Sequence, residues 1–183
     1  TESHDLAAQE PVKLQEMISH WFHLAGMYNG LPLLDKTAVE VLADPTRPQM
    51  APPRDRYVYY PGAAEVPESA AVSIRNRSYT IEVEVDIQTP EAEGVLFSHG
   101  ARFGGHSLYV KDRRLKYVYN FVGSNEQMIE STKDIPTGRV ILSAAFEREG
   151  DSMPTTGTVS LYINDEKVGE GRIMTQPGNF SLV

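Results

Sequence analysis

The fold of this chain is decided by residues 94–123, GVLFSHGARFGGHSLYVKDRRLKYVYNFVG, where short alternating runs of apolar and polar residues are separated by Gly, Asn and Asp. A second stretch of the same kind, GTVSLYINDEKVGEG, covers residues 157–171. Alternation with a period of two is typical of half-buried strands, and short polar breaks are typical of tight turns. Because no helical pattern lies between these segments, they predict a mainly β fold, an antiparallel and jelly-roll-like β-sandwich.

The clearest single strand is predicted at residues 80–88. Its apolar and acidic residues alternate strictly: Ile81, Val83, Val85 and Ile87 on one face, Glu82, Glu84 and Asp86 on the other. We expect the apolar face in the core and the acidic face in water. The carboxylates also have the chemistry that glycoside hydrolysis requires, but neighbours on one strand share a wet face and do not flank a cleft.

Further strands are predicted on both sides of residues 112–114, which form a short hairpin connection. Residues 140–146 and 158–163 continue the series, and residues 164–166 turn the chain into a strand that contains Val168. A short aromatic strand at residues 56–60 is expected to join a sheet at its edge.

Residues 11–28 have the periodicity of an amphipathic helix that begins at Pro11. Its apolar residues recur at steps of three and four: Leu14, Met17, Ile18, Trp21, Ala25 and Tyr28. A helix of this length is marginal in water by itself. We therefore expect Met17, Trp21 and Tyr28 to pack on another surface, either the sandwich or a domain outside this chain.

Composition divides the chain into three parts. Residues 1–34 form a terminal segment with the helix, residues 35–67 a Pro-rich connector, and residues 68–183 the sandwich. The prolines of the connector interrupt helices and favour extended backbone. A further strand is predicted to begin at residues 180–183, so we expect a sandwich that is cut short and a chain that belongs to a longer protein.

Charge and composition exclude several classes of partner and site. The net charge of the 183 residues is -8 and Lys and Arg are not clustered, so we expect neither nucleic acid nor an anionic membrane as a partner. The absence of Cys excludes a disulfide framework, a thiolate zinc site and a cysteine nucleophile. No apolar run is long enough to span a bilayer, and no targeting signal is recognisable.

A glycine-rich segment provides the first candidate site. His99, Arg102 and His106 are interspersed with three glycines in what we expect to be one loop between two strands. Backbone N–H groups of such loops bind anions, and cationic side chains beside them add charge. The segment matches neither a P-loop nor a dinucleotide fingerprint, because no Lys-Ser/Thr and no helix follow it. A structural loop whose glycines take positive φ explains the same residues.

Tyr109 is the candidate for an exposed aromatic ligand contact. Tyr117 and Tyr119 share a strand face with Leu115 and Phe121, so they are predicted to lie in the core, whereas Tyr109 is predicted to face outward. An exposed ring can stack on a sugar. Together with Arg102 and the glycine segment, Tyr109 supports the hypothesis of a carbohydrate-binding module.

One face of the predicted helix carries possible metal ligands. Glu16, His20 and His23 lie at i, i+4 and i+7, opposite Trp21. A metal site needs further ligands and hydrogen bonds that orient them, and the sequence locates neither. An ordinary solvated helix face is the alternative.

Several segments resemble the large bacterial arylsulfatases. Residues 2–7 (ESHDLA), the helix, and residues 30–35 (GLPLLD) resemble the closing segment of the catalytic domain of that family, while residues 94–123 and 157–173 resemble the concanavalin- or laminin-G-like sandwich at its C-terminus. The resemblance implies the non-catalytic C-terminal part of a sulfuric ester hydrolase in the cytoplasm or periplasm of a bacterium. Its expected partners are the upstream catalytic domain and, in an oligomer, a second copy.

The resemblance carries over no catalytic residue. The family uses a formylglycine made from a Cys/Ser-x-Pro-x-Arg motif together with a divalent cation, usually calcium. The nearest approach here, residues 152–156 (SMPTT), has Thr where the motif requires Arg. We therefore expect calcium in the parent catalytic domain and no cofactor in this chain. A free carbohydrate-binding module and a stand-alone enzyme with a metal on the helix stay open as alternatives.

Overall fold

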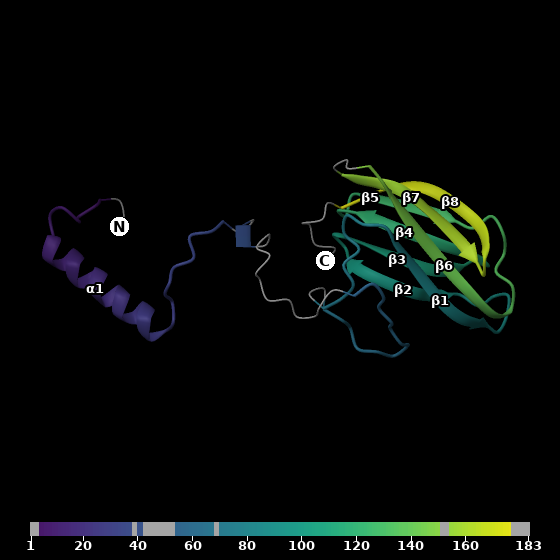
Figure 1. Ribbon diagram of the computed structural model, residues 1–183, viewed down its shortest axis with the longest axis horizontal. Coiled ribbons are helices and arrows are strands. Elements are labelled where there is room, and N and C mark those ends of the chain that lie inside the picture. The colour runs from purple at the N-terminus through teal and green to yellow at the C-terminus, as the bar shows by residue number, and fades with distance from the viewer. Residues whose placement is uncertain (1–3, 38–39, 42–53, 68–69, 151–153, 177–183) are drawn as a thin grey trace. The chain divides into compact units, whose positions relative to one another are not determined.

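The fold was obtained as a computed structural model that describes residues 4–37, 40–41, 54–67, 70–150 and 154–176. The chain divides into two units between Arg47 and Pro48. The first unit contains helix α1 (Pro11–Met27), and the second contains strands β1 to β8 (Figure 1).

The second unit is a sandwich of two antiparallel four-stranded sheets (Figure 1). One sheet has the order β1-β6-β7-β8: β1 (Tyr79–Ile87), β6 (Gly138–Glu149), β7 (Thr155–Ile163) and β8 (Glu166–Thr175). The other has the order β2-β3-β4-β5: β2 (Gly94–Ala101), β3 (Gly104–Lys111), β4 (Arg114–Phe121) and β5 (Asn125–Glu130). The predicted antiparallel sandwich, with an amphipathic helix before it in the sequence, is therefore confirmed.

The core lies between the two sheets because apolar residues alternate along the inner faces of both. The side chains with no measurable exposure come from each sheet: Leu108, Leu115 and Tyr117 from one, and Leu142, Val159 and Leu161 from the other. Full burial of a side chain of this size contributes roughly 1.5–3 kcal/mol to stability. The prediction that Tyr117 and Tyr119 belong to the core is confirmed.

Strand β1 has the predicted alternation of faces. Glu82, Glu84 and Asp86 are exposed, whereas the apolar residues between them are half-buried and Ile87 is buried. The apolar side is only partly covered because β1 is an edge strand that pairs with β6 alone.

Two predicted turns are confirmed, and each joins neighbouring strands. Asp112 and Arg113 connect β3 to β4 with φ values of 53° and 65°, so this two-residue turn has the positive φ angles of type I′. Asn164, with φ 53°, begins the β7–β8 turn. Its backbone N donates to the Ile141 carbonyl at 2.7 Å, and its Oδ1 accepts from the Ile141 N at 3.0 Å. The side chain thus ties this turn to β6.

The expected edge strand at residues 56–60 is wrong. These residues form no ladder with any strand that the structure describes, and the hydrogen bonds of Tyr57 and Tyr59 are made by their side-chain hydroxyls. Tyr59 Oη accepts from the Val72 N at 3.1 Å, and Tyr57 Oη accepts from the Arg54 N at 3.3 Å.

Strand β5 is absent from the sequence prediction. Its six residues, NEQMIE, are mostly polar, and Ile129 is the buried one. The strand forms because β4 offers it a ladder from Lys116 to Phe121. The predicted strand at residues 180–183 lies outside the described residues.

Candidate functional site

The glycine-rich candidate segment is a hairpin, so the prediction of one loop is wrong. Residues up to Ala101 belong to β2, those from Gly104 belong to β3, and the turn between them is Arg102 and Phe103. Gly100 and Gly105 suggested a loop, but they face each other in the β2–β3 ladder with φ values of 114° and 128°. Their positive φ, which was predicted, is a conformation that other residues rarely adopt.

The hairpin separates the four candidate residues. His99 and His106 are directly opposite each other, and their ring centroids are 5.6 Å apart. His106 is only 4% exposed. Arg102 is exposed in the turn, and Tyr109 lies on the opposite face of β3 from His106. The structure therefore brings together the two histidines and neither of the other two residues.

The histidines belong to a larger group of buried and half-buried side chains, which we call the His-Tyr cluster: Tyr79, His99, His106, Tyr117 and Tyr119. Tyr117 Oη lies 3.1 Å from His106 Nδ1 and 2.6 Å from Tyr79 Oη. Tyr79 is on β1 and Tyr117 is on β4, so this chain of hydrogen bonds joins the two sheets.

Tyr119 extends the cluster toward the end of β8. Its Oη donates to Oε1 of Gln176 at 3.3 Å and accepts from the backbone N of Gln176 at 3.0 Å. The Gln176 amide fits there because residue 104 is a glycine. A Cβ at that position would lie 2.5 Å from Gln176 Oε1.

Burial keeps His106 and the three tyrosines of the His-Tyr cluster neutral at neutral pH. Burial lowers the pKa of His106 to about 3, and positive charge on His99 adds to this effect. Burial also raises the pKa values of the Tyr117, Tyr79 and Tyr119 hydroxyls, for Tyr117 well above its usual value. A general acid or base works best with a pKa near the working pH, so these groups are suited to holding the sheets together and not to proton transfer.

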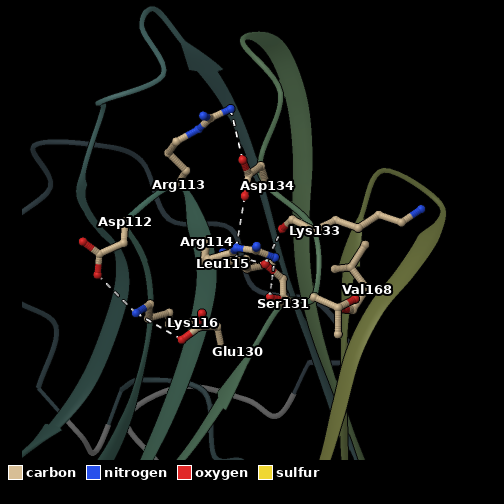
Figure 2. Close-up of polar contacts among 11 residues, drawn as sticks. Asp112, Arg113, Arg114, Leu115, Lys116, Glu130, Ser131, Lys133, Asp134 and Val168 are labelled. Carbon is tan, nitrogen blue, oxygen red and sulfur yellow. Dashed lines mark hydrogen bonds and ion pairs between the residues drawn. The ribbon is translucent and has the colours of Figure 1, made fainter.

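A second polar group lies around the β3–β4 turn and the segment that follows β5, and Figure 2 shows its residues. This group was not predicted from the sequence. We call it the rim cluster: Asp112, Arg113, Arg114, Lys116, Glu130, Ser131 and Asp134. Asp134 forms 3.1 Å ion pairs with Arg113 Nη2 and with Arg114 Nε. Arg114 Nη1 also donates to the Ser131 carbonyl at 3.1 Å.

The rim cluster fastens the segment that crosses from β5 to β6. Ser131 Oγ accepts from the Leu115 N at 3.1 Å and donates to the Lys133 carbonyl at 2.8 Å (Figure 2). Lys116 Nζ is 3.1 Å from Glu130 Oε2 and 3.5 Å from Asp112 Oδ2. Because each cation here already has a carboxylate partner, the cluster has no unpaired positive charge with which to bind sulfate or another anion.

Tyr109 lies on the outer face of the β2-β3-β4-β5 sheet. Its Oη donates to Met128 Sδ at 3.4 Å. Val95, its ladder neighbour, is 67% exposed and Met128 is 58% exposed. With the half-buried Val118 opposite Met128, these residues form an apolar patch that we call the Tyr109 face: Val95, Tyr109, Val118 and Met128. Arg102 is not part of it, since it lies in the β2–β3 turn.

The structure describes helix α1 in full, and none of the residues of this helix is buried. Trp21 is 45% exposed, Met17 61% and Tyr28 74%, and the Trp21 ring meets Phe22 edge-on at 4.9 Å. Glu10 precedes the helix without making a side-chain cap. The packing of this stripe on another surface therefore stays a prediction.

The possible metal ligands on α1 are exposed, and Glu16 forms a 3.1 Å ion pair with Lys13. Within the described ranges, no group of three or more His, Cys, Asp or Glu residues is arranged to hold a metal ion. Those ranges also contain no helix that is long and apolar enough to cross a membrane. Of the residues 152–156, the first two lie outside the described part, and Thr155 and Thr156 begin β7.

Comparisons with known protein families, with characterised proteins and with solved structures find no match for this chain. The grounds for a functional proposal are therefore the residues, their geometry and the resemblance of several segments to arylsulfatases.

Proposed function

We propose that this chain is the non-catalytic C-terminal part of an arylsulfatase and that α1 packs on the catalytic domain. The observation that carries the proposal is the apolar stripe of α1. Leu14 and Ile18 are each 40% exposed and Trp21 is 45% exposed, whereas the sandwich encloses a core of its own. The helix is the element that requires a partner surface.

The physical reason is the weakness of such a helix by itself. It has 17 residues, little more than the length of about 12–15 below which isolated helices are marginal in water, and it has no side-chain N-cap. In proteins, most of the stability of such a helix comes from packing of its apolar face. Covering an apolar stripe contributes roughly 25 cal/mol for each Å² removed from water. The resemblance to arylsulfatases implies that the catalytic domain is the surface that covers this stripe.

The sandwich suits a supporting role in such an enzyme. Its polar groups are used internally, as a neutral cluster between the sheets and as an ion-paired rim. In this proposal the formylglycine, the calcium ion and the sulfate ester belong to the parent catalytic domain. The sandwich supports that domain, its substrate entrance or contacts between copies.

The reading frame that encodes the chain provides the first test. We expect codons upstream of Thr1 to encode a Cys/Ser-x-Pro-x-Arg motif and the paired acidic metal ligands of a sulfatase. A frame that encodes another kind of domain there, or that starts within a few codons of Thr1, would contradict the proposal.

An activity assay complements this test. The purified chain, incubated with a chromogenic aryl sulfate and calcium, should release no product, whereas the full-length parent should. Sulfatase activity that copurifies with the chain through several columns would show that the chain is itself an enzyme.

The packing of α1 is tested by Trp21→Ala in the full-length parent. Truncating a buried Trp typically costs about 3–5 kcal/mol, so the unfolding midpoint should fall clearly. The matched control is His20→Ala, on the exposed opposite side of the same helix, which should leave the midpoint unchanged. Equal midpoints for both variants would mean that the stripe has no packing role.

A carbohydrate-binding module is the second candidate, favoured by the Tyr109 face. A partly exposed ring beside exposed Val95 and Met128 provides an apolar platform of the kind on which a sugar ring stacks. Calorimetric titration with sulfated and unsulfated oligosaccharides tests it. Tyr109→Ala should weaken binding up to about tenfold. Glu84→Ala, on the other sheet, is the control, and absence of any heat would exclude this candidate.

A further inference from the structure

The histidine pair has a feature that the proposed function does not use. His106 is 4% exposed, and its ring is surrounded by other rings: Phe97 at 5.3 Å, Tyr79 and His99 at 5.6 Å, and Tyr117 at 5.8 Å. Two groups that each can take up a proton thus lie next to each other between the sheets. A charge placed there would lose its hydration and would meet a second imidazole.

Among the residues that the structure describes, His106 has no negatively charged partner. The titratable groups that face it are His99 from β2, Tyr117 and Tyr119 from β4, and Tyr79 from β1. Phe97 packs against the His106 ring, Phe146 against the Tyr79 ring, and Gln176 bonds Tyr119, and none of the three adds charge. His106 Nδ1 is engaged with Tyr117 Oη, and no carboxylate in the described part of the chain forms a hydrogen bond or ion pair with either ring nitrogen.

The topology makes one edge of the sandwich sensitive to this pair. His99 is on β2, which is an edge strand of its sheet and, among the described strands, pairs with β3 alone. The inward side chains Phe97 and His99 hold β2 on the core. Moving β2 outward would separate the two imidazoles and admit water to both of them.

We propose that His99 and His106 form an acid-sensitive lock that keeps the edge strand β2 closed on β3 and the core while the His106 ring is neutral and releases this edge when His106 is protonated. The proposal is independent of the arylsulfatase assignment, because it depends on the sandwich alone.

The direction of the pH dependence follows from burial. The pKa of His106 is lowered from 6.5 to about 3 in the folded protein, so the open or unfolded state binds the proton more readily. The stability supplied by the neutral ring is fully present above pH 6.5 and is lost as the pH falls toward 3. Within that window, each pH unit multiplies the opening equilibrium constant about tenfold.

Urea unfolding of the 183-residue protein, followed by far-UV circular dichroism, tests the lock. His106→Asn removes the titrating group and keeps a polar atom near the position of Nδ1. Between about pH 7.5 and pH 4.5, the unfolding constant of the wild type should rise roughly 100-fold more than that of this variant. The control is His20→Asn on α1, whose unfolding constant should follow that of the wild type. Parallel curves for wild type and His106→Asn would overturn the proposal.

Hydrogen exchange and NMR of the wild type keep the proposal testable even where the variant does not fold. At about pH 4.5 the amides of β2 should exchange faster than those of β6 and β7, and the His106 ring signals should not shift while the protein remains folded. A His106 ring that titrates near its ordinary pKa in the folded state would refute the lock. Uniform acceleration of exchange in all strands would also refute it, because acid would then unfold the sandwich as a whole.

Discussion

Polar contacts join the two sheets at both ends of the sandwich. At one end these contacts are neutral and lie between the sheets, and at the other they lie among exposed ion pairs. The buried Tyr117 joins the sheets through a neutral hydrogen bond to Tyr79. At the rim, the segment after β5 is joined to β8 by Thr132, whose N and Oγ1 donate to the Val168 carbonyl at 2.6 Å and 2.8 Å, among exposed ion pairs. Contacts of similar length thus lie in very different surroundings, and the surroundings decide what the loss of a polar contact costs.

The reason is solvation. A buried hydroxyl that loses its partner cannot turn to water, and the loss costs about 1–3 kcal/mol. An exposed carboxylate or guanidinium that loses its partner is hydrated at once, and such pairs contribute roughly 0–1 kcal/mol. The two ends should therefore respond very differently to substitution, to pH and to salt.

The largest effect is expected from substitutions of Tyr117. Tyr117→Ala removes a fully buried aromatic ring and should cost about 3–5 kcal/mol in the free energy of unfolding. Tyr117→Phe keeps the ring but leaves Tyr79 Oη and His106 Nδ1 without their partner, so a loss of about 1–3 kcal/mol is expected. Denaturant titration at neutral pH measures both. Tyr109→Phe on the outer face is the control, and a Tyr117→Phe protein as stable as this control would refute the role of the hydrogen bonds.

Alkaline pH should weaken the His-Tyr cluster. Burial raises the pKa of Tyr117 well above 10.0, so the unfolded chain releases this proton first. The stability that the neutral hydroxyl contributes is fully present below pH 10 and is lost above it. In that range the equilibrium constant for unfolding should rise about tenfold for each pH unit and for each such tyrosine. Absorbance near the phenolate band should show Tyr117 and Tyr79 ionising only as the sandwich unfolds. Early and complete ionisation of all tyrosines in the folded protein would contradict their burial.

A smaller effect is expected at the rim from Asp134→Asn. The change weakens the pairs with Arg113 and Arg114, whose side chains are 53% and 30% exposed, and should cost roughly 0.5–1 kcal/mol. Unlike the loss at Tyr117, this one should shrink when salt is raised, because the Debye length falls to about 3 Å at 1 M. An effect that does not depend on salt would mean that Asp134 acts through packing or backbone geometry.

The smallest effect is expected from Glu84→Gln. Glu84 is paired with Arg139 across β1 and β6, and hydrogen bonding from that guanidinium lowers the Glu84 pKa, yet both side chains are largely exposed. The unfolding midpoint should not change measurably. A clear destabilisation would show that the acidic face of β1 is covered in solution, and the first surface to examine would be that of a neighbouring domain.

The local sequence pattern was sufficient to predict the structure where the residues of a single strand or turn determine it. The faces of β1 and the turns at Asp112 and Asn164 were predictable, because alternation and turn residues act over a few neighbouring positions. Strand β5 was not predictable, since its residues are polar and its ladder comes from β4. The prediction at residues 56–60 was wrong in the opposite way, because a segment with the composition of a strand forms no ladder with any described strand.

The histidine candidates were identified from the sequence, but with the wrong surroundings. Glycines beside His99 and His106 suggested a loop for anions, whereas Gly100 and Gly105 face each other within a ladder. The partners of the pair, Tyr79 and Tyr117, are 38 residues apart in the chain, and no local motif joins them. The rim cluster was missed for the same reason, since its charges come from two hairpins and a crossover.

The sequence by itself determined the class of fold, the helix at residues 11–27, and which residues of β1 and β4 face the core, because these follow from periodicity within single elements. The tertiary structure alone decided which polar residues meet, which of them are cut off from water, and so which are neutral and which are paired ions. Hydration and charge depend on what lies across the gap between two sheets, and that neighbour is set by strand order and register across the whole chain.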